Sequence, residues 1–531
     1  MTNKPEVLSE IRILDRDEIL KSDHFAICLN LDFKIKRLKC NKRKIYNFKK
    51  ANWDSLNYEL KRVTWNSHIQ ACDPTTAWLK FKSILLSLCD KHIPKVTIRP
   101  NSSPPWFDSE VYKLCTNKEK FRKLYKQTND PSHYKKFKSC RKEVKKLIKK
   151  KMRSNFDDDE NENIITKKFW SYVKSSSNSS RLPDCMSAKG KFRNNHKDIA
   201  DLFNTHFYEQ FSKKSNYNID IDFRNDPFIN FKITHQDVRK FLISLNQNKS
   251  HGPDGINGKI LRNCAVSIAY PLSILFNLSF STGHIPSEWK LANIVPVHKK
   301  GDKNAIENYR PISLTCLIMK IFEKCIRNEL LRLCQDKIHF SQHGFLPSKS
   351  CTTQLIPFVN DITLNLNNNY TTDIIYFDFA KAFDSVNHDI ILSKLKYEFK
   401  IDGLMLKFLR DYLQNRKQRV VVGDVTSLEL DVLSGVPQGS IIGPLLFVLF
   451  INDIHKCVSP GTNVALYADD TKIWRAIKSE SDCLALQNDI DALSHWSKIN
   501  CMNFHPQKCK VLCVSHQFNP CNIILPFMRF T

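Results

Sequence analysis

The sequence has no long hydrophobic run and no regular cysteine motif. Its longest apolar run, Ile441–Ile451, is too short to cross a bilayer and contains a Gly-Pro break. The first residues lack the apolar core of a secretory signal peptide. The 18 cysteines form no paired CxxC motif and therefore read as reduced thiols. These absences predict an intracellular protein that does not span a membrane.

Acidic residues are too few to balance the basic ones. The chain of 531 residues has 82 Lys and Arg against 54 Asp and Glu, which gives a formal net charge of +28. A hydrophobic content of 42% excludes a disordered chain and, at this length, predicts about three or four domains. The positive excess predicts a polyanionic partner, with nucleic acid as the main candidate.

Much of the positive charge lies between Lys113 and Arg153, where 17 Lys and Arg face 3 acids. Apolar residues recur there at steps of three and four, which predicts an amphipathic helix with a basic outer face. These residues are Tyr134, Phe137, Cys140, Val144, Leu147 and Ile148. A merely solvated helix is the alternative, but the bias toward one sign favours contact with a phosphate backbone.

Two adjacent acids, Asp469 and Asp470, interrupt the segment VALYADDTKIW. The apolar residues on both sides predict two strands, so the acids are expected at the tip of a tight hairpin. Since Asp is a common turn residue, turn chemistry alone favours an ordinary solvated turn for an isolated pair. The segment acquires chemical meaning only through acids elsewhere in the chain.

Asp378 is such an acid. The segment DIIYFDFAKAFD predicts a strand over residues 374–379 with Asp378 inside it. A carboxylate in an apolar strand is costly unless a cation or hydrogen bonds compensate, although a salt-bridged or strand-end Asp is the alternative. Convergence of Asp378 with the hairpin acids would create an oxygen-only site suited to magnesium. Only the fold can bring them together, because Asp378 and Asp469 are far apart in the sequence.

Between these acids lies the segment SGVPQGSIIGPLLF. Gly435, Pro437 and Gly439 predict a turn with exposed backbone that enters an apolar helix. Gln438 offers both a donor and an acceptor at this turn.

The order FDFAKAFD, SGVPQGSIIGPLLF and YADD resembles motifs A, B and C of reverse transcriptases. Upstream segments, including NYRPISL and SQHGFLPSKSCTTQL, resemble those of the non-LTR, LINE-type and jockey-like, retrotransposon branch. The resemblance covers residues 235–515. It implies an α+β fold with right-hand polymerase fingers and an antiparallel palm sheet, preceded by a basic helical extension.

The resemblance also implies roles for individual residues. Catalysis and binding of Mg²⁺, with Mn²⁺ as a substitute, would fall to Asp378, Asp469, Asp470 and the carbonyl of Phe379. Lys508 would protonate pyrophosphate. The nucleotide would contact Lys299, Lys300, Arg310, Phe383, Gln438 and Gly439. Phe383 would crowd a ribose 2′ hydroxyl, although plain packing also explains it, and Asp384 keeps a ribonucleotide polymerase open as an alternative. Each basic residue is equally compatible with ordinary surface charge.

The ends of the chain carry further expectations. Ser22, Asp23 and His24 resemble the signature near the end of an apurinic-type endonuclease, so the chain is expected to begin inside such a domain and to stop before a thumb. The expected divisions are a nuclease remnant over 1–35, a basic helical extension and linker over 36–185, fingers and the start of the palm over 186–375, palm over 376–515, and a tail over 516–531.

The sequence therefore predicts an RNA-directed DNA polymerase of a retrotransposon. Its expected partners are an RNA template, a DNA primer and deoxynucleoside triphosphates, and its expected place of action is the nucleus. The alternative is a catalytically idle retroelement remnant that only binds nucleic acid.

Overall fold

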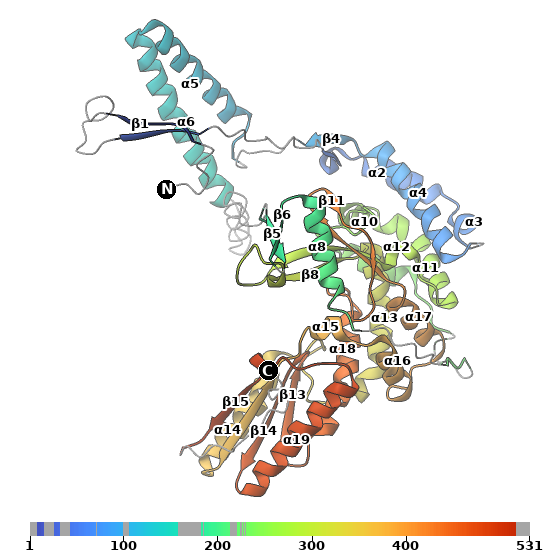
Figure 1. Cartoon of the computed structure of the whole chain (residues 1–531). Helices are drawn as coiled ribbons and strands as arrows, with labels where there is room; N and C mark the ends of the chain where they lie inside the picture. The colour runs from blue at the N-terminus through green and yellow to red at the C-terminus, as the bar shows by residue number, and fades with distance from the viewer. Residues whose placement is uncertain are drawn as a thin grey trace. The chain divides into compact units, whose positions relative to one another are not determined.

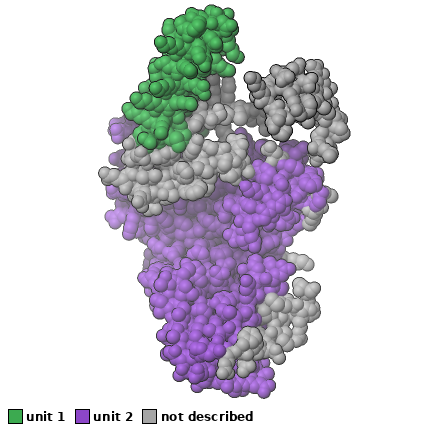
Figure 2. Space-filling model, turned by 90° about the vertical axis from the view of Figure 1, so that its left-hand side faces the viewer, with its two compact units in different colours: residues 1–47, 95–177 green, residues 48–94, 178–531 purple. Residues whose placement is uncertain are grey.

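In the computed structural model (Figure 1), the chain forms two compact units, which Figure 2 shows in different colours. Unit 1 comprises residues 1–47 and 95–177, and unit 2 comprises residues 48–94 and 178–531. The predicted extension over 36–185 is thus divided between them. The structure describes residues 8–14, 26–31, 43–70, 72–98, 106–157, 182–183, 185–188, 190–212, 220–223, 226, 228 and 230–516.

Unit 1 consists of two strand pairs and a helical hairpin. Its elements are β1 (Leu8–Leu14), β2 (Ala26–Leu31), β3 (Arg43–Tyr46), β4 (Lys95–Ile98), α5 (Ser109–Thr128) and α6 (Pro131–Asp157). Strand β1 pairs with β2, and β3 pairs with β4, both antiparallel.

The basic segment forms two helices, not the single helix that its periodicity predicts. Helix α5 begins at the N-cap Asp108 and ends at Asn129, which adopts a left-handed conformation with φ 52°. Pro131 then opens α6, because proline is well tolerated in a first helical turn. Lys151 of α6 forms ion pairs with Asp108 and Glu110, which joins the far end of α6 to the start of α5.

Unit 2 begins with helices that pack against its later part. Its first elements are η2 (Phe48–Lys50), α2 (Trp53–Arg62), α3 (Trp65–Ile69) and α4 (Pro74–His92). Trp78 of α4 is fully buried and contacts the ring of Trp289 edge-on at 5.2 Å. Its indole nitrogen donates to Glu288, 2.6 Å away. These contacts join residues 48–94 to unit 2.

The middle of unit 2 is mostly helical. Its elements are β5 (Met186–Ala188), β6 (Lys191–Arg193), α8 (His196–Tyr208), α9 (His235–Ile243), α10 (Gly258–Asn263), α11 (Ala265–Thr282), α12 (Ser287–Lys290), β7 (Leu291–His298), η3 (Ile306–Asn308), β8 (Tyr309–Leu314), α13 (Leu317–Cys334), η4 (Gln335–Lys337) and α14 (Cys351–Asn367).

The last part of unit 2 carries the predicted motifs. Its elements are β9 (Thr371–Phe377), α15 (Ala382–Ser385), α16 (His388–Tyr397), α17 (Gly403–Leu413), β10 (Lys417–Val422), β11 (Val425–Thr426), β12 (Leu430–Asp431), α18 (Gly443–Ile451), η5 (Asn452–Cys457), β13 (Thr462–Tyr467), β14 (Asp470–Ile477), α19 (Glu480–Ile499), η6 (Pro506–Lys508) and β15 (Lys510–Val514).

Two sheets organise unit 2. A mixed sheet has the order β11-β10-β7-β8, with β12 also on β10; β10 and β7 run parallel, whereas β7 and β8 run antiparallel. The second sheet has the order β13-β14-β9-β15 and is antiparallel throughout. The predicted combination of helices with an antiparallel sheet is therefore confirmed.

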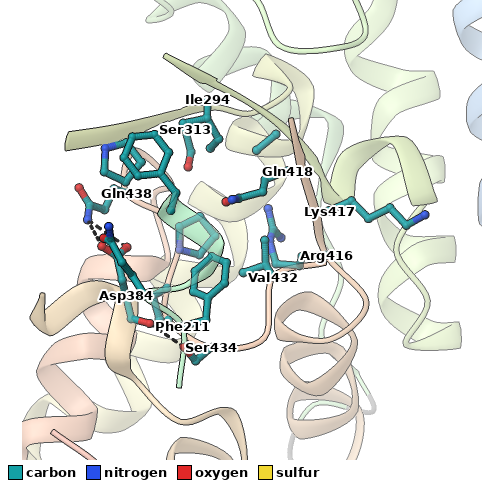
Figure 3. Close-up of a pocket in the computed structure, with 17 residues that line it drawn as sticks. Phe211, Ile294, Ser313, Asp384, Arg416, Lys417, Gln418, Val432, Ser434 and Gln438 are labelled. Atoms are coloured by element: carbon teal, nitrogen blue, oxygen red, sulfur yellow. Dashed lines mark hydrogen bonds between the residues drawn. The ribbon is translucent and has the colours of Figure 1, made fainter. Parts of the chain in front are cut away.

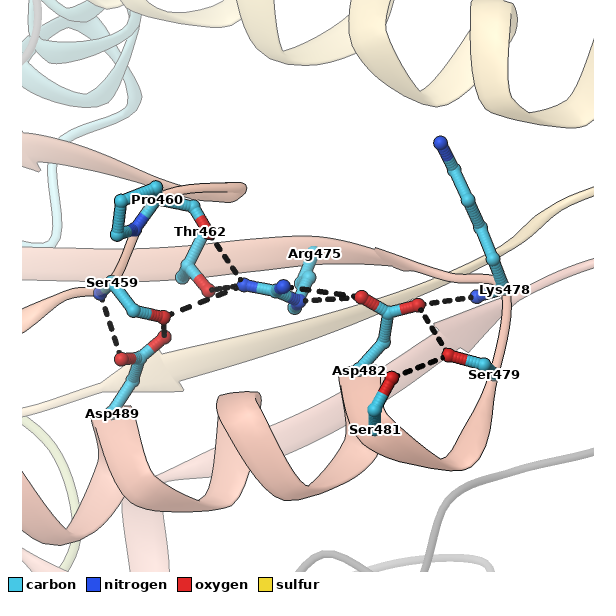
Figure 4. A network of polar contacts seen from close by, with 9 residues as sticks. All are labelled: Ser459, Pro460, Thr462, Arg475, Lys478, Ser479, Ser481, Asp482 and Asp489. Atoms are coloured by element: carbon cyan, nitrogen blue, oxygen red, sulfur yellow. Dashed lines mark hydrogen bonds and ion pairs between the residues drawn. The ribbon is translucent and has the colours of Figure 1, made fainter.

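Helices cover both faces of the antiparallel sheet. Phe358 of α14 packs edge-on against Trp474 of β14 at 5.0 Å. Arg475 is the next residue of β14, so its side chain leaves by the opposite face, where it bonds Asp482 of α19 (Figure 4). The same guanidinium donates to the Pro460 carbonyl and to Thr462, which ties the start of β13 to α19.

Helix α11 is the one described helix long and apolar enough to cross a membrane by composition. Most of it lies within the protein, where Leu272, Leu275 and Phe276 are fully buried. Phe276 stacks on Phe322 of α13 at 4.7 Å. In this structure α11 is therefore a core helix of unit 2.

The cysteines are mostly free thiols, as predicted. The free cysteines include buried residues such as Cys264 and Cys316. The prediction is wrong for Cys483, which is disulfide-bonded.

Candidate active site

Asp378 lies directly after β9, which ends at Phe377. The predicted strand over 374–379 therefore starts three residues too late and runs two residues too far, and Asp378 is not inside the observed strand. Phe379 instead pairs with Phe504, flanked by hydrogen bonds from His505 N to the Asp378 carbonyl and from Ala380 N to the Asn503 carbonyl. The Asp378 side chain is 37% exposed. Its ionised form consequently costs far less than a carboxylate buried within a strand would.

The YADD segment forms the predicted tight hairpin. Tyr467 and Asp470 are cross-strand partners, which leaves Ala468 and Asp469 as a two-residue turn. Ala468 has φ 56°, a left-handed conformation that turns of this length commonly require. Asp469 thus lies at the tip, and Asp470 is the first residue of β14.

Strand register brings Asp378 next to this tip. Strands β14 and β9 are antiparallel, with Thr471 opposite Phe377. Asp470 and Asp378 are the next residues beyond this last pair, and the charge of Asp378 acts on both Asp469 and Asp470. The fold therefore joins the acids of the two separate motifs.

The electrostatics agree with this placement. Burial, followed by the charges of Asp470 and Asp378, raises the pKa of Asp469, which nearby Arg310 opposes. Burial and the charge of Asp378 raise the pKa of Asp470. The raised pKa values thus reflect burial first and repulsion among the carboxylates second, and a divalent cation would offset both.

Lys508 supplies a positive charge at this cluster. Its ammonium Nζ lies 2.7 Å from Oδ1 of Asp378. Lys508 ends η6, whose preceding residue His505 bonds the Asp378 main chain. The pairing of residues 503–505 with the chain after β9 therefore places this lysine.

The donor set fits magnesium. Three carboxylates supply hard oxygen ligands, and the hydrogen bonds around the Phe379 and Phe504 pair leave the Phe379 carbonyl out of that pairing. Within the described ranges, however, no three His, Cys, Asp or Glu side chains form a preassembled metal-ligand group. Asp378 is engaged by Lys508, so its carboxylate would have to exchange this partner for a metal ion.

The predicted basic residues lie at the same site. Arg310 is exposed on β8 opposite Val297, and its charge reaches Asp469. Desolvation, followed by Arg310, Lys508 and Lys300, lowers the pKa of Lys299, whereas Asp378 opposes this shift. Lys299 and Lys300 are exposed just after β7. The mixed sheet thus presents cations to the acids of the antiparallel sheet.

Phe383 is partly buried and its ring is held by two others. It stacks on Phe447 of α18 at 4.6 Å and meets Phe345 edge-on at 6.0 Å. These contacts fit both plain packing and a fixed wall beside a sugar.

The side chain of Gln438 already has a hydrogen-bonding partner within the protein. Its amide Nε2 donates to both carboxylate oxygens of Asp384, at 3.1 and 3.0 Å, beside a small cavity of about 40 Å³ (Figure 3). Burial raises the pKa of Asp384 to about 6, which the Gln438 bond and Lys381 oppose. The sequence points to Asp384 but not to this pair, because its members belong to different motifs.

The turn around Gln438 packs closely against Ser313 and Asp384. Ser313 N donates to the Gln438 carbonyl at 3.0 Å, and a Cβ on Gly439 would lie 2.9 Å from the Ser313 carbonyl oxygen. A Cβ on Gly435 would lie 2.7 Å from Asp384 Cα. Both glycines also have positive φ, so this turn requires them.

Asp23 and His24, the predicted nuclease remnant, lie outside the described residues, as does most of the predicted tail over 516–531.

Residues 297–521 match the family described as "Reverse transcriptase (RNA-dependent DNA polymerase)". These residues form a reverse transcriptase domain. The predicted resemblance is therefore confirmed for the segment that contains all three acids.

Three relatives of this reverse transcriptase domain come from non-LTR transposons of Drosophila melanogaster. The chain is 28% identical over 355 residues to a probable RNA-directed DNA polymerase from transposon BS, covering 62% of this chain and 38% of that protein. It is 29% identical over 300 residues to the RNA-directed DNA polymerase from mobile element jockey, covering 54% and 32%. It is 27% identical over 269 residues to a probable RNA-directed DNA polymerase from transposon X-element, covering 49% and 29%. The matches thus span about a third of these curated relatives.

A solved structure of apo telomerase from Candida tropicalis, truncated from its C-terminal domain, matches with a TM-score of 0.35 and 11% identity. It covers 50% of this chain and 65% of that one. A TM-score this low carries no argument about function.

Proposed function

We propose that unit 2 is an RNA-directed DNA polymerase that extends a primer 3′ end with deoxynucleotides on an RNA template during retrotransposition. The observation that carries this proposal is the convergence of Asp378, Asp469 and Asp470 within a reverse transcriptase domain. The names of the transposon relatives support the same activity.

In this proposal the antiparallel sheet with α14 and α19 is the palm, and the mixed sheet with its surrounding helices belongs to the fingers. Asp378, Asp469, Asp470 and the Phe379 carbonyl would hold Mg²⁺, or Mn²⁺ in its place. When bound, these ions supply activation of a 3′ hydroxyl and stabilisation of leaving pyrophosphate.

The other groups of the site act on the nucleotide. Arg310 and Lys299, with Lys300 beside them, would bind a triphosphate through charge, and Arg offers a planar fork for paired contacts. Lys508 holds a proton at Nζ beside Asp378 and would deliver it to pyrophosphate. The ring of Phe383, held by Phe447 and Phe345, would exclude a 2′ hydroxyl. The main chain of the turn at Gln438 and Gly439 would face the base pair.

The basic hairpin α5 and α6 supports a nucleic-acid partner. Nearly all of its lysines and arginines are exposed, while Val111 and Val144 are its buried apolar residues. We propose that it contacts RNA phosphates, with the nucleus as the place of action.

A primer-extension assay tests the function. Purified full chain, an RNA template with an annealed DNA primer, Mg²⁺ and deoxynucleotides are compared for wild type and Asp469→Ala, with RNA binding measured separately. Extension by wild type that Asp469→Ala abolishes, with RNA binding retained, supports the proposal. Equal and negligible incorporation with retained RNA binding overturns it in favour of a binding remnant. Preference for ribonucleotides would indicate an RNA polymerase.

A further inference from the structure

The loop Ser341–Phe345, just before α14, runs beside the turn that carries Asp469. Leu466 N donates to the Ser341 carbonyl at 3.0 Å, and His343 N donates to the Leu466 carbonyl at 2.9 Å. Gln342 is thereby the parallel bridge partner of Leu466. The loop extends the antiparallel sheet at the outer edge of β13.

The side chain of Gln342 reaches the turn itself. Its Oε1 accepts hydrogen bonds from Ala468 N at 3.1 Å and from Gly344 N at 2.7 Å. Gln342 is only 1% exposed, so water does not replace these bonds. Two main-chain donors also fix which end of the amide faces the turn.

Gly344 lets the loop approach this closely. A Cβ there would lie 2.3 Å from Ala468 N, a distance that no side chain tolerates. Ala468 has φ 56° and is buried, so a left-handed residue immediately before Asp469 depends on its surroundings. The bond from Ala468 N to Gln342 stabilises that conformation.

The loop is anchored on its other side. His343 Nδ1 lies 2.8 Å from Thr353 Oγ1, and Thr353 belongs to the capping box that starts α14 with Ser350. Arg327 donates to the Phe345 carbonyl at 3.3 Å. The loop therefore connects a rigid helix start to the catalytic turn.

The same loop contacts Phe383, the residue proposed to exclude a ribose 2′ hydroxyl. Phe345 has φ 59°, a strained conformation for an aromatic residue, and its ring meets Phe383 edge-on at 6.0 Å. Phe447 holds the face of Phe383.

We propose that Ser341–Phe345 is a positioning segment of the active site: Gln342 holds the turn that carries Asp469, and Phe345 holds the ring of Phe383. This assignment rests on the proposed polymerase function. It adds two positioning residues, neither of which touches the reacting atoms.

Gln342→Met tests the first half, because methionine has similar length but cannot accept both amide bonds. Gln354→Met is the matched control: Gln354 is also buried but lies on α14. We expect Gln342→Met to lower kcat about 10- to 100-fold, since misplacement of a catalytic group by about 1 Å costs this much. The KM for deoxynucleotide should change less than about 2-fold, and the control should resemble wild type.

Hydrogen exchange supplies a readout independent of activity. Mass spectrometry of the peptide over residues 464–471 should show faster amide exchange in Gln342→Met than in Gln354→Met. Gln342→Glu keeps an acceptor oxygen at the same reach in either protonation state, so it should restore slow exchange. Equal exchange in Gln342→Met and Gln342→Glu overturns the proposal. An inactive wild type would contradict the polymerase function, while this exchange comparison would still decide whether Gln342 holds the turn.

Phe345→Gly tests the second half, since glycine accepts the positive φ while the ring is lost. Phe340→Gly is the control, because Phe340 is 77% exposed and its ring contacts His339 rather than Phe383. We expect the ratio of kcat/KM for deoxynucleotide over ribonucleotide to fall about 10-fold in Phe345→Gly only. An unchanged ratio overturns this role.

Discussion

Lys508 and Asp378 form an ion pair at the candidate active site, with Nζ 2.7 Å from Oδ1. A cation that binds Asp378 must displace this ammonium. The two side chains are 39% and 37% exposed, so their attraction is modest.

Lys508→Met should therefore strengthen binding of Mn²⁺ to the free protein about 1.5- to 5-fold. Isothermal titration calorimetry without nucleic acid measures this, and Lys510→Met on neighbouring β15 is the control. Loss of the proton donor should at the same time lower kcat. Unchanged or weaker metal binding would show that the ion pair does not compete with the metal.

Asp384→Asn should stabilise the protein at neutral pH. Burial raises the pKa of Asp384 from 3.8 to about 6, a difference that corresponds to about 3 kcal/mol. The folded state thus disfavours the ionised carboxylate, a cost that is complete above pH 6 and vanishes toward pH 4. Asparagine keeps an oxygen for Gln438 and carries no charge.

Urea unfolding of both proteins at pH 8 and pH 4.5 checks this prediction. The advantage of Asp384→Asn should be about 2–3 kcal/mol at pH 8 and should shrink at pH 4.5, because the wild-type acid becomes protonated. Lys381, whose charge favours ionised Asp384, limits the effect. A difference in unfolding free energy between the two proteins that does not change with pH would contradict the raised pKa of Asp384.

Glu323 stabilises the entry into α18. This fully buried carboxylate accepts hydrogen bonds from the main-chain amides of Ile441 and Ile442 and from the Tyr412 hydroxyl. Glu323→Ala should lower the free energy of unfolding by about 2–4 kcal/mol, because it leaves buried donors without a partner. Tyr412→Phe removes only the hydroxyl and should cost about 1 kcal/mol. Equal losses in the two variants in urea titrations would argue against this role.

Substitutions at Gly435 and Gly255 distinguish the cost of a steric clash from the cost of an unfavourable backbone conformation. Both have positive φ, 86° and 72°, but a Cβ would lie 2.7 Å from Asp384 Cα only at Gly435, with nothing within 4 Å at Gly255. Gly255→Ala should cost about 1–2 kcal/mol from conformation alone. Gly435→Ala should cost about 1–3 kcal/mol more and reduce primer extension. If Gly435→Ala and Gly255→Ala unfolded at similar temperatures, the turn around Gly435 would accommodate a Cβ without loss of stability.

Helix α6 provides a test of phosphate contact. Lys142, Lys145, Lys146 and Lys149 are exposed or nearly so, whereas Lys151 is paired with Asp108 and Glu110. Each Lys→Gln change in the first group that removes a contact should reduce the slope of log affinity against log salt by about 0.7 for single-stranded RNA. Lys151→Gln should leave the slope nearly unchanged. Identical slopes in all variants would exclude α6 from the RNA interface.

The parts of the site that follow from local pattern were predictable. Two apolar runs around adjacent acids predicted the hairpin and the placement of Asp469 at its tip. The end of α5 also has a local signal, the Asn-Asp-Pro run at residues 129–131, which hydrophobic periodicity does not detect.

The rest depends on partners far away in the sequence. Asp378 lies outside its strand because Phe379 pairs with Phe504, and no local pattern reveals that partner. The bond between Gln438 and Asp384 joins two motifs, and the bond between Gln342 and Ala468 joins the loop before α14 to the turn between β13 and β14. Tertiary pairing decides these contacts, so residue order alone could not predict them.

The register of β14 on β9 has a consequence for assembly of the protein. Seven cross-strand pairs, from Thr471 with Phe377 to Ile477 with Thr371, form a ladder that ends just before Asp470 and Asp378. A slip by one residue would turn every side chain of one strand to the other face and part the two acids. A chain that has collapsed without completing this ladder would be inert, so nucleotide incorporation would report correct strand alignment more sensitively than helix content does.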